Sequence, residues 1–288
     1  MVMDKSIVFD HFIELLPKLK KDHDPKSLLY QFLKTVTRHK IEEIYNALTQ
    51  GSAFVFEPFG QLYFPYYSMG AVDTSNFFDL DEMILYSFYW ANRKRYKNVL
   101  DLGANVGLHS ILLNRCGYQV KSYEPDPDHF KKLQENLLKN ECRSEAYNVA
   151  VSSGKRMMEF VRVLGNTTGS HLKGSKANPY GPLELIDVET ISFQEIVGWA
   201  DLVKMDIEGH EKEVILSTTF EDWSHLDLLV EVGNETNARE IFHHATQLGI
   251  NLFSQKIGWN LAEHERDVPW SYKEGTLFMT QKDTMPWG

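Results

Sequence analysis

The chain has 288 residues, 43% of them hydrophobic and 24% charged, and a formal net charge of −10. This mixture is typical of a soluble globular protein, and the acidic balance argues against a protein that follows a nucleic-acid backbone, which needs a basic surface. We find no apolar run near the roughly 18 residues of a membrane span and no apolar signal-peptide core. Cys116 and Cys142 lack metal-binding or redox spacing, so we expect free thiols in a reducing, cytoplasmic compartment.

Apolar side chains recur at helical spacing through residues 1–50, for example at Leu28, Leu29, Phe32 and Leu33. An amphipathic, lysine-bearing segment of this kind packs as a cap on another domain, contacts a second subunit or touches a membrane surface. We adopt the cap, and we also consider a homodimer formed through these helices. Two short strands at 53–56 and 62–64 flank a turn at 57–60. Residues 1–78 are therefore predicted to form an N-terminal cap of helices and short strands.

A helix is predicted at 79–93, and beyond it strands and helices alternate. Seven strands are predicted, at 99–102, 119–123, 144–149, 202–206, 226–232, 250–254 and 276–280. Helices are predicted between them at 108–115, 128–139, 211–217 and 238–248. This alternation indicates an α/β, Rossmann-like fold over residues 79–288, with a mostly parallel seven-stranded sheet and helices on both faces. Extra strands at 156–163 and 183–190, a polar loop at 165–182 and a long loop at 256–275 interrupt it.

The turn after the first of these strands identifies the ligand class. Asp101 ends the strand, Gly103 and Gly107 follow it, and Glu124 ends the next strand. An acid at the end of the second strand is suited to the ribose hydroxyls of an adenosine-bearing cofactor. The glycine spacing differs from that of dinucleotide sites, and a carboxylate at the first strand end would repel a pyrophosphate but attract the ammonium of a methionine moiety. The pattern therefore favours S-adenosylmethionine over NAD.

Three motifs resemble those of the FkbM family of S-adenosylmethionine-dependent methyltransferases. They are VLDLGANVG (residues 99–107), SYEPDPDHFKKLQENL (122–137) and DLVKMDIEGHEKEVI (201–215), the last with the pattern K-x-D-x-E-G-x-E. The resemblance implies a class I methyltransferase fold. It also implies an enzyme that transfers a methyl group to a hydroxyl of a sugar, a glycan or a small natural product.

We expect the cofactor site to be formed by residues at the ends of the first three strands. The candidate cofactor-binding residues are Asp101, Gly103, Asn105, His109, Glu124, Pro125, Asp126, Asn148, Val149 and Asp206. Asp101 is expected near the amino group of the methionine moiety and Glu124 on the ribose hydroxyls. Pro125, Asp126, Asn148 and Val149 are expected beside the adenine. For His109, a contact with the methionine carboxylate and a capping or packing role are equally consistent with the sequence.

The candidate catalytic residues are Asp206, Glu231 and His210. Asp206 ends a strand that should adjoin the Asp101 strand, although it could instead cap the following helix. Lys204, inside that apolar strand, is expected to pair with an acid. His210 is considered as a general base because of its ordinary pKa.

Glu231 should lie beside Asp206 at the end of the adjacent strand. With Glu208 or Glu235, the two could hold Mg²⁺, Mn²⁺ or Ca²⁺ and so acidify the acceptor hydroxyl. Alternatively, Glu231 acts without metal, as a base or as a hydrogen-bond partner of the substrate. Spacing does not distinguish these alternatives.

The loop at 256–275 carries Trp259, Trp270 and Tyr272, together with His264 and Arg266. Its aromatic rings either stack on a sugar or anchor the loop itself. Two other functions compete with O-methylation. A nucleic-acid methyltransferase is disfavoured by the acidic balance and by the absence of an Asn/Asp-Pro-Pro-aromatic turn. A cofactor-binding scaffold without catalysis is disfavoured because four acids, at positions 101, 124, 206 and 231, occur together.

Overall fold

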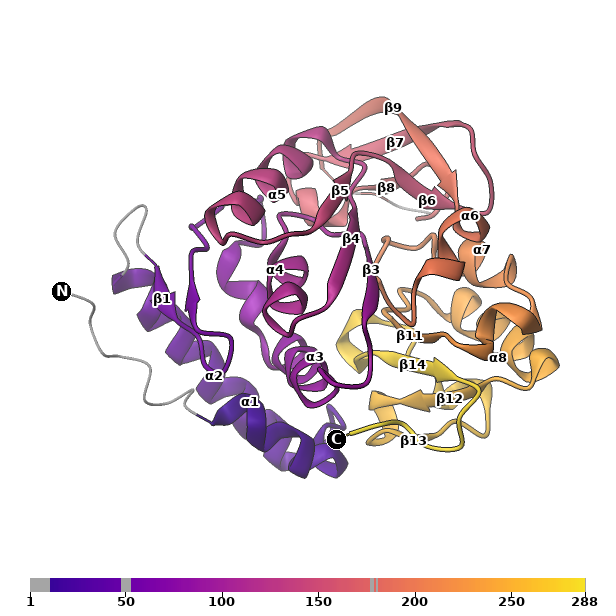
Figure 1. The fold of residues 1–288 in the computed structure, drawn as a ribbon, viewed down its shortest axis with the longest axis horizontal. Coiled ribbons are helices and arrows are strands. Elements are labelled where there is room, and N and C mark those ends of the chain that lie inside the picture. The colour runs from indigo at the N-terminus through magenta and orange to yellow at the C-terminus, as the bar shows by residue number, and fades with distance from the viewer. Residues whose placement is uncertain (1–10, 48–52, 177–178, 180, 288) are drawn as a thin grey trace.

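The computed structural model describes residues 11–47, 53–176, 179 and 181–287. Its centre is a sheet with the strand order β13-β12-β14-β11-β10-β3-β4-β5 (Figure 1). The strands are β3 (Asn98–Leu102), β4 (Gln119–Tyr123), β5 (Glu145–Tyr147), β10 (Leu202–Met205), β11 (Asp227–Val230), β12 (Asn251–Ser254), β13 (Asn260–Leu261) and β14 (Leu277–Thr280). β3, β4, β5, β10 and β11 pair in parallel, whereas β14 runs antiparallel to β11 and β12. The seven predicted strands are present, and the short β13 occurs where the sequence predicts a loop.

Helices cover both faces of this sheet. They are α3 (Leu80–Ala91), α4 (Leu108–Arg115), α5 (Pro127–Lys139), α6 (Phe193–Ile196), α7 (Glu211–Leu216) and α8 (Glu235–Leu248). Val99 and Leu202 pack in one core with α3, α4 and α5, whereas the next residues, Leu100 and Val203, pack in a second core with α6, α7 and α8. Successive strand residues point to opposite faces, so a strand covered on both sides must be apolar throughout. The predicted α/β architecture is confirmed.

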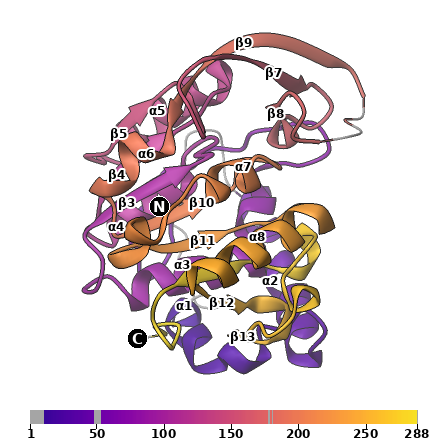
Figure 2. The same ribbon diagram turned by 90° about the vertical axis from the view of Figure 1, so that its right-hand side faces the viewer.

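A smaller sheet, with the order β6-β9-β7-β8, lies above the main sheet in Figure 2. Its strands are β6 (Ala150–Ser152), β7 (Met157–Val163), β8 (His171–Leu172) and β9 (Leu183–Ser192). β7 and β9 match the two extra predicted strands, but the sequence does not predict β6 or β8. The strand expected at 144–149 ends early, since the Asn148 amide donates to the carbonyls of Glu124 and Pro125 at 2.8 and 3.0 Å. The chain then leaves the main sheet and pairs with β9.

The N-terminal segment shares its core with the helices next to it in space. Its elements are α1 (Phe12–Leu15), the 3-10 helix η1 (Leu16–Asp22), α2 (Leu28–Ala47), β1 (Phe54–Val55), β2 (Gln61–Leu62) and the 3-10 helix η2 (Thr74–Phe78). Ile13, Leu16 and Tyr30 are buried in the same core as Met83 and Ile84 of α3. This shared core is what a cap packed on the rest of the chain requires. The helix predicted over residues 1–10 lies outside the described residues.

One face of α2 remains open to solvent. Leu28 and Phe32 are 90% and 63% exposed, one helical turn apart. A homodimer through this region stays a prediction. Within the part of the chain that the structure describes, every helix is too short or too polar to cross a bilayer.

Candidate functional site

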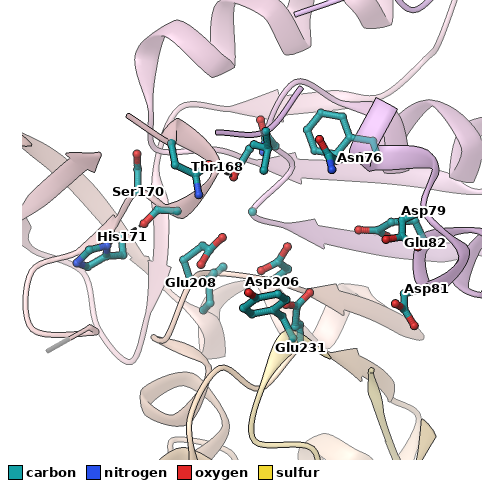
Figure 3. A pocket seen from close by; sticks show the side chains of 18 of the residues that line it. Asn76, Asp79, Asp81, Glu82, Thr168, Ser170, His171, Asp206, Glu208 and Glu231 are labelled. Carbon is teal, nitrogen blue, oxygen red and sulfur yellow. Dashed lines mark hydrogen bonds between the residues drawn. The ribbon is translucent and has the colours of Figure 1, made fainter. Parts of the chain in front are cut away.

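A cavity of about 1000 Å³ opens at the carboxyl ends of the central strands (Figure 3). Gly103 and Asn105 reach it from β3, Glu124 from β4, Asp206 from β10 and Glu231 from β11. Parallel sheets bind ligands at this edge, where loops from neighbouring strands diverge. The structure therefore brings together strand-end residues that are far apart in the sequence.

Three further segments line the cavity, and only in the third does the sequence suggest a contact with the substrate, through Tyr272. The first is the N-terminal segment, which contributes residues 24–26, Tyr30, Gln31 and Lys34. The second is the smaller sheet with its connecting loop, including residues 166–172. The third is the loop before β14, with residues 272–274. Because these segments are brought to the cavity from distant parts of the chain, local sequence patterns do not predict that they lie together.

The turn after β3 allows very close backbone packing. Gly103 has φ +77°, and a Cβ atom there would lie 1.8 Å from the backbone oxygen of Asp206. A side chain at this position is therefore excluded by both conformation and space. The next turn residue, Asn105, adopts φ 51° and donates its backbone N–H to Glu124 Oε2 at 2.8 Å. Its side-chain Oδ1 is buried and, among the described residues, has no hydrogen-bond donor.

Backbone amides hold the Glu124 carboxyl group from two sides. Oε2 accepts from Asn105, and Oε1 accepts from the N–H of Asp126 at 2.8 Å. Burial raises the pKa of Glu124 to about 8 despite these bonds. Each carboxylate oxygen can accept a second hydrogen bond, so the group retains capacity for hydroxyl donors of a ligand. The orphaned Asn105 oxygen and this carboxyl group together fit the polar part of a nucleoside ligand.

Asp101 is sealed beneath the cavity. Its side chain is fully buried, Oδ2 accepts from Ser110 Oγ at 2.5 Å, and Oδ1 lies 3.5 Å from Lys204 Nζ. Lys204 also donates to the Gly103 carbonyl at 3.2 Å and lies 4.0 Å from Asp206 Oδ2. The expected pairing of Lys204 with an acid is therefore present. The expected position of Asp101 beside a methionine amino group is not supported, since Asp101 does not line the cavity.

Of the two roles expected for His109, the structure agrees with packing, because the ring is buried against those of Tyr86 and Tyr89. It lies behind the cavity wall, with Nε2 3.0 Å from Glu82 Oε2 and Nδ1 2.9 Å from the Tyr89 hydroxyl. Glu82 itself lines the cavity, although the sequence does not predict it as a site residue. An acid in the first turn of an apolar helix is explained by the helix dipole alone, so its sequence context gives no reason to select it.

Three carboxyl groups, those of Asp206, Glu208 and Glu231, gather at the ends of β10 and β11 (Figure 3). Burial and the charge of Asp206 raise the pKa of Glu208 to about 7 and that of Glu231 well above its ordinary value. Lys176 pairs with Glu208. Asp206 does not cap a helix, since α7 begins five residues later with His210 at its N-cap.

The carboxyl groups do not form a cation site in this structure. Across the described residues, no cluster of three or more His, Cys, Asp and Glu side chains is arranged to hold a metal ion. Glu235, one predicted ligand, instead pairs with Arg239 on the outside of α8 and does not line the cavity. The divalent cation predicted on Asp206 and Glu231 is therefore not supported.

His210 is not supported as a general base. Its Nε2 lies 2.9 Å from Ser152 Oγ and its Nδ1 lies 3.1 Å from Ser175 Oγ, so both ring nitrogens have hydroxyl partners. Burial lowers its pKa, and the ring does not line the cavity. It connects Ser152 of β6 to Ser175, which follows β8, and is better described as a structural residue.

The expected adenine contacts are only partly in place. Pro125 and Asp126 line the cavity, although the Asp126 carboxylate is occupied by the N-terminus of α5 and by Arg162 Nε at 2.8 Å. Asn148 and Val149 do not line it. Their places are taken by the next two residues, Ala150 and Val151, because the chain turns away from the main sheet at Asn148.

The aromatic residues of the 256–275 loop divide between the two expected roles. Trp259 is an anchor: it is buried, donates to His23 Nδ1 at 2.9 Å and contacts Trp287 edge-on. Trp270 lies under Lys256, with Nζ 3.9 Å from the ring centroid, and does not reach the cavity. Tyr272 is 65% exposed and lines it. His264 and Arg266 do not line the cavity.

Glu211, next to this site, gives a testable pH dependence. Its Oε1 accepts from the N–H groups of Ile207 and Gly209 at 3.0 and 3.1 Å, and burial raises its pKa to about 7. The folded state therefore binds this proton more tightly than the unfolded state, so stability is lost as pH rises from about 4.5 to about 7.

We expect Glu211→Gln to gain roughly 1–3 kcal/mol of unfolding free energy relative to the unchanged protein between about pH 5 and about pH 8. Urea unfolding at the two pH values measures this difference. Glu213→Gln, on the exposed side of the same helix, is the control and should show no such change. An equal effect of Glu211→Gln at both pH values would contradict the assignment.

Comparisons of the sequence with known proteins find methyltransferases, and the matched residues include several that line the cavity. The sequence profile described as "Methyltransferase FkbM domain" matches residues 101–249. Hexuronic acid methyltransferase AglP from Haloferax volcanii is 29% identical over 126 residues, which cover 41% of this chain and 48% of AglP. The chain thus spans about half the length of this relative.

Two solved structures match the chain at low identity. The SAM-dependent methyltransferase from Agrobacterium tumefaciens has 9% identity and a TM-score of 0.43, and the match covers 82% of this chain and 72% of that one. The StiE O-MT structure has 13% identity and a TM-score of 0.33, covering 56% and 48%. Since the family profile spans over half of the sequence and includes both the β3 turn and the β10 strand end, the chain belongs to the FkbM methyltransferase family.

Proposed function

We propose that this protein is an S-adenosylmethionine-dependent O-methyltransferase acting on a hydroxyl group of a sugar, a glycan or a small natural product. The observation that carries the proposal is the excess of carboxyl groups over cations around the β3 turn and the ends of β10 and β11. Acidic walls favour a cationic sulfonium donor and disfavour a pyrophosphate. The name of AglP, a hexuronic acid methyltransferase, supports a sugar acceptor.

The donor would be held by residues at the ends of β3 and β4. Glu124 would accept hydrogen bonds from the ribose hydroxyls, and Gly103 and Asn105 would face the methionine half. Pro125 would border the adenine with Ala150 and Val151, which replace Asn148 and Val149 in this role. When bound, S-adenosylmethionine supplies a methyl carbon that the acceptor oxygen attacks as the carbon–sulfur bond breaks and the sulfur keeps the electron pair.

Asp206 is the proposed general base, accepting the proton of the acceptor hydroxyl. Lys204 Nζ lies 4.0 Å from its Oδ2. Burial and the neighbouring acids raise the pKa of Glu231 well above its ordinary value, which favours its protonated form. A neutral Glu231 can donate a hydrogen bond to the acceptor. The acceptor is thus positioned by one carboxyl group while the other takes its proton.

The N-terminal segment and the loop before β14 would form the acceptor side of the cavity. Tyr30 and Lys34 reach Asp81 Oδ2 at 2.6 and 3.0 Å, and Gln255 at the end of β12 reaches Asp81 Oδ1 at 2.7 Å. These bonds attach the cap to the sheet edge beyond β11. We accordingly keep residues 1–78 as a cap that completes the 79–288 methyltransferase domain.

Two lysines on this side are suited to an acidic sugar. Lys26 and Lys273 line the cavity and, within the described residues, have no carboxylate partner. The other lining lysines, Lys34, Lys176 and Lys256, already pair with acids. A hexuronic acid carboxylate would therefore be met by Lys26 and Lys273.

Calorimetry with S-adenosylmethionine followed by a turnover assay tests the proposal. We expect binding, and methyl transfer from labelled donor to a pool of nucleotide sugars and glycans, detected as a mass gain of one methylene. Turnover should be the same with Mg²⁺ and with EDTA. Binding of NAD in place of the donor would contradict the proposal. Donor binding without any methylated product would favour a scaffold.

A further inference from the structure

The position of Asp101 leaves the ammonium group of the proposed donor without its expected partner. Asp101 is fully buried, lies 3.5 Å from Lys204 Nζ and does not line the cavity. A primary ammonium group in a partly buried site needs a carboxylate or carbonyl partner. A carboxylate partner for the ammonium group must therefore come from another element that reaches the same side of the cavity.

Glu82 is the acid that the geometry provides. It lies in the first turn of α3 and lines the cavity, across from Glu208 in Figure 3. Its side chain is 26% exposed, and Oε2 is held 3.0 Å from His109 Nε2. His109 is in turn held by the Tyr89 hydroxyl at 2.9 Å. For Oε1, no hydrogen-bond partner occurs among the described residues, so this oxygen is available to a ligand.

One support of Glu82, His109, is connected to the cofactor turn, whereas Tyr89 lies on α3 with Glu82. His109 is the second residue of α4, the helix that starts directly after the β3 turn at Gly107. A chain of contacts from Tyr89 through His109 to Glu82 therefore fixes a carboxylate relative to this turn. Hydrogen bonds of this kind hold a binding side chain in one orientation before the ligand arrives.

The charge state of Glu82 differs from that of its neighbours. Burial alone would raise its pKa, but the charges of His109 and Lys204 outweigh this and lower it. In contrast, the pKa of Glu231 is raised by burial and the surrounding acids. Glu82 is thus held as an anion at neutral pH.

The two other acids of the α3 start are already engaged. Asp79 caps α3 through Leu80 N and pairs with Lys34. Asp81 accepts from Tyr30, Lys34 and Gln255. Glu82 is therefore the acid of this group with an oxygen left for the ligand.

We propose that Glu82, positioned by His109 and Tyr89, binds the α-ammonium group of the methionine moiety of the donor. This proposal rests on the proposed function, because it assumes that the cavity takes S-adenosylmethionine. It assigns Glu82 to donor binding, and His109 is a positioning residue rather than a catalytic one.

Calorimetry with three ligands tests the assignment. S-adenosylhomocysteine carries the ammonium group, its deaminated analogue keeps only the carboxylate, and methylthioadenosine lacks the whole amino-acid tail. Glu82→Gln should weaken S-adenosylhomocysteine binding by about 10–100-fold, the effect of losing a charged hydrogen bond. It should leave the other two affinities within about twofold. His109→Gln should show the same selectivity with a smaller loss.

Glu124→Gln is the matched comparison, since it should weaken all three ligands alike. If Glu82→Gln weakened methylthioadenosine as much as S-adenosylhomocysteine, the ammonium assignment would be overturned. It would also be overturned if the unchanged protein bound the deaminated analogue as tightly as S-adenosylhomocysteine, a comparison that needs no variant. If the unchanged protein bound neither S-adenosylhomocysteine nor methylthioadenosine, the proposed function itself would fail.

Discussion

Asp206→Asn is expected to lower kcat by about 10²–10⁴-fold, the usual contribution of a general base. The amide keeps the shape of the side chain but cannot take the acceptor proton. Donor affinity should change by less than about threefold, because Glu124 and the β3 turn hold the donor elsewhere in the cavity. Steady-state kinetics and calorimetry on the same preparation measure the two effects.

Glu231→Gln is the control for this experiment. A protonated carboxyl and a primary amide both donate a hydrogen bond, so we expect only about a tenfold loss of kcat. If Asp206→Asn reduced donor affinity and kcat by the same factor, Asp206 would be a binding residue and not the base. If Glu231→Gln were the more damaging of the two, the roles would be exchanged.

At about pH 8.5, where Glu124 is largely ionised, Glu124→Ala is expected to weaken S-adenosylmethionine binding by roughly 100-fold or more, since charged hydrogen bonds to two hydroxyls would be lost. The change also removes the acceptor for the Asn105 and Asp126 amides, which shape the β3 turn and the start of α5. Isothermal titration calorimetry gives the loss directly. A thermal melt of each variant shows whether the fold is retained.

The raised pKa of Glu124, about 8, adds a pH test. The ionised carboxylate is the better hydrogen-bond acceptor, so affinity of the unchanged protein should increase as pH rises from about 6.5 to about 8.5. Glu124→Gln cannot ionise and should show a flat profile over this interval. A pH dependence that persisted in Glu124→Gln would assign the titration to another group.

The sequence predicts the main sheet well because the apolar pattern of each strand indicates a strand buried on both faces. Val99–Leu100 and Leu202–Val203 are apolar on both strand faces, as buried parallel strands must be. The smaller sheet is harder to predict. β6 and β8 have three and two residues, and their pairing with β9 and β7 depends on partners far away in the sequence.

Within the site, the sequence locates residues along a strand but does not identify their partners. Asp101 and Asp206 both end strands, yet Ser110 and Lys204 seal the first while the second reaches the cavity. Glu82 is missed for the same reason, since its importance comes from His109 on another helix. The differences between the predicted and the observed site arise from side-chain contacts between elements, and the periodicity of a single element does not predict such contacts.

The N-terminal cap is joined to elements that come late in the sequence. Asp81 joins Tyr30 to Gln255, and His23 lies against Trp259 and Trp287. The early helices pack on α3, which follows them closely in the chain, so much of their apolar surface can be covered early in synthesis. The contacts of His23 and Asp81 with residues 255–287, in contrast, can form only well after the donor-binding turn at residues 103–105 has left the ribosome. Folding of the acceptor side of the cavity should accordingly finish later than folding of the donor side.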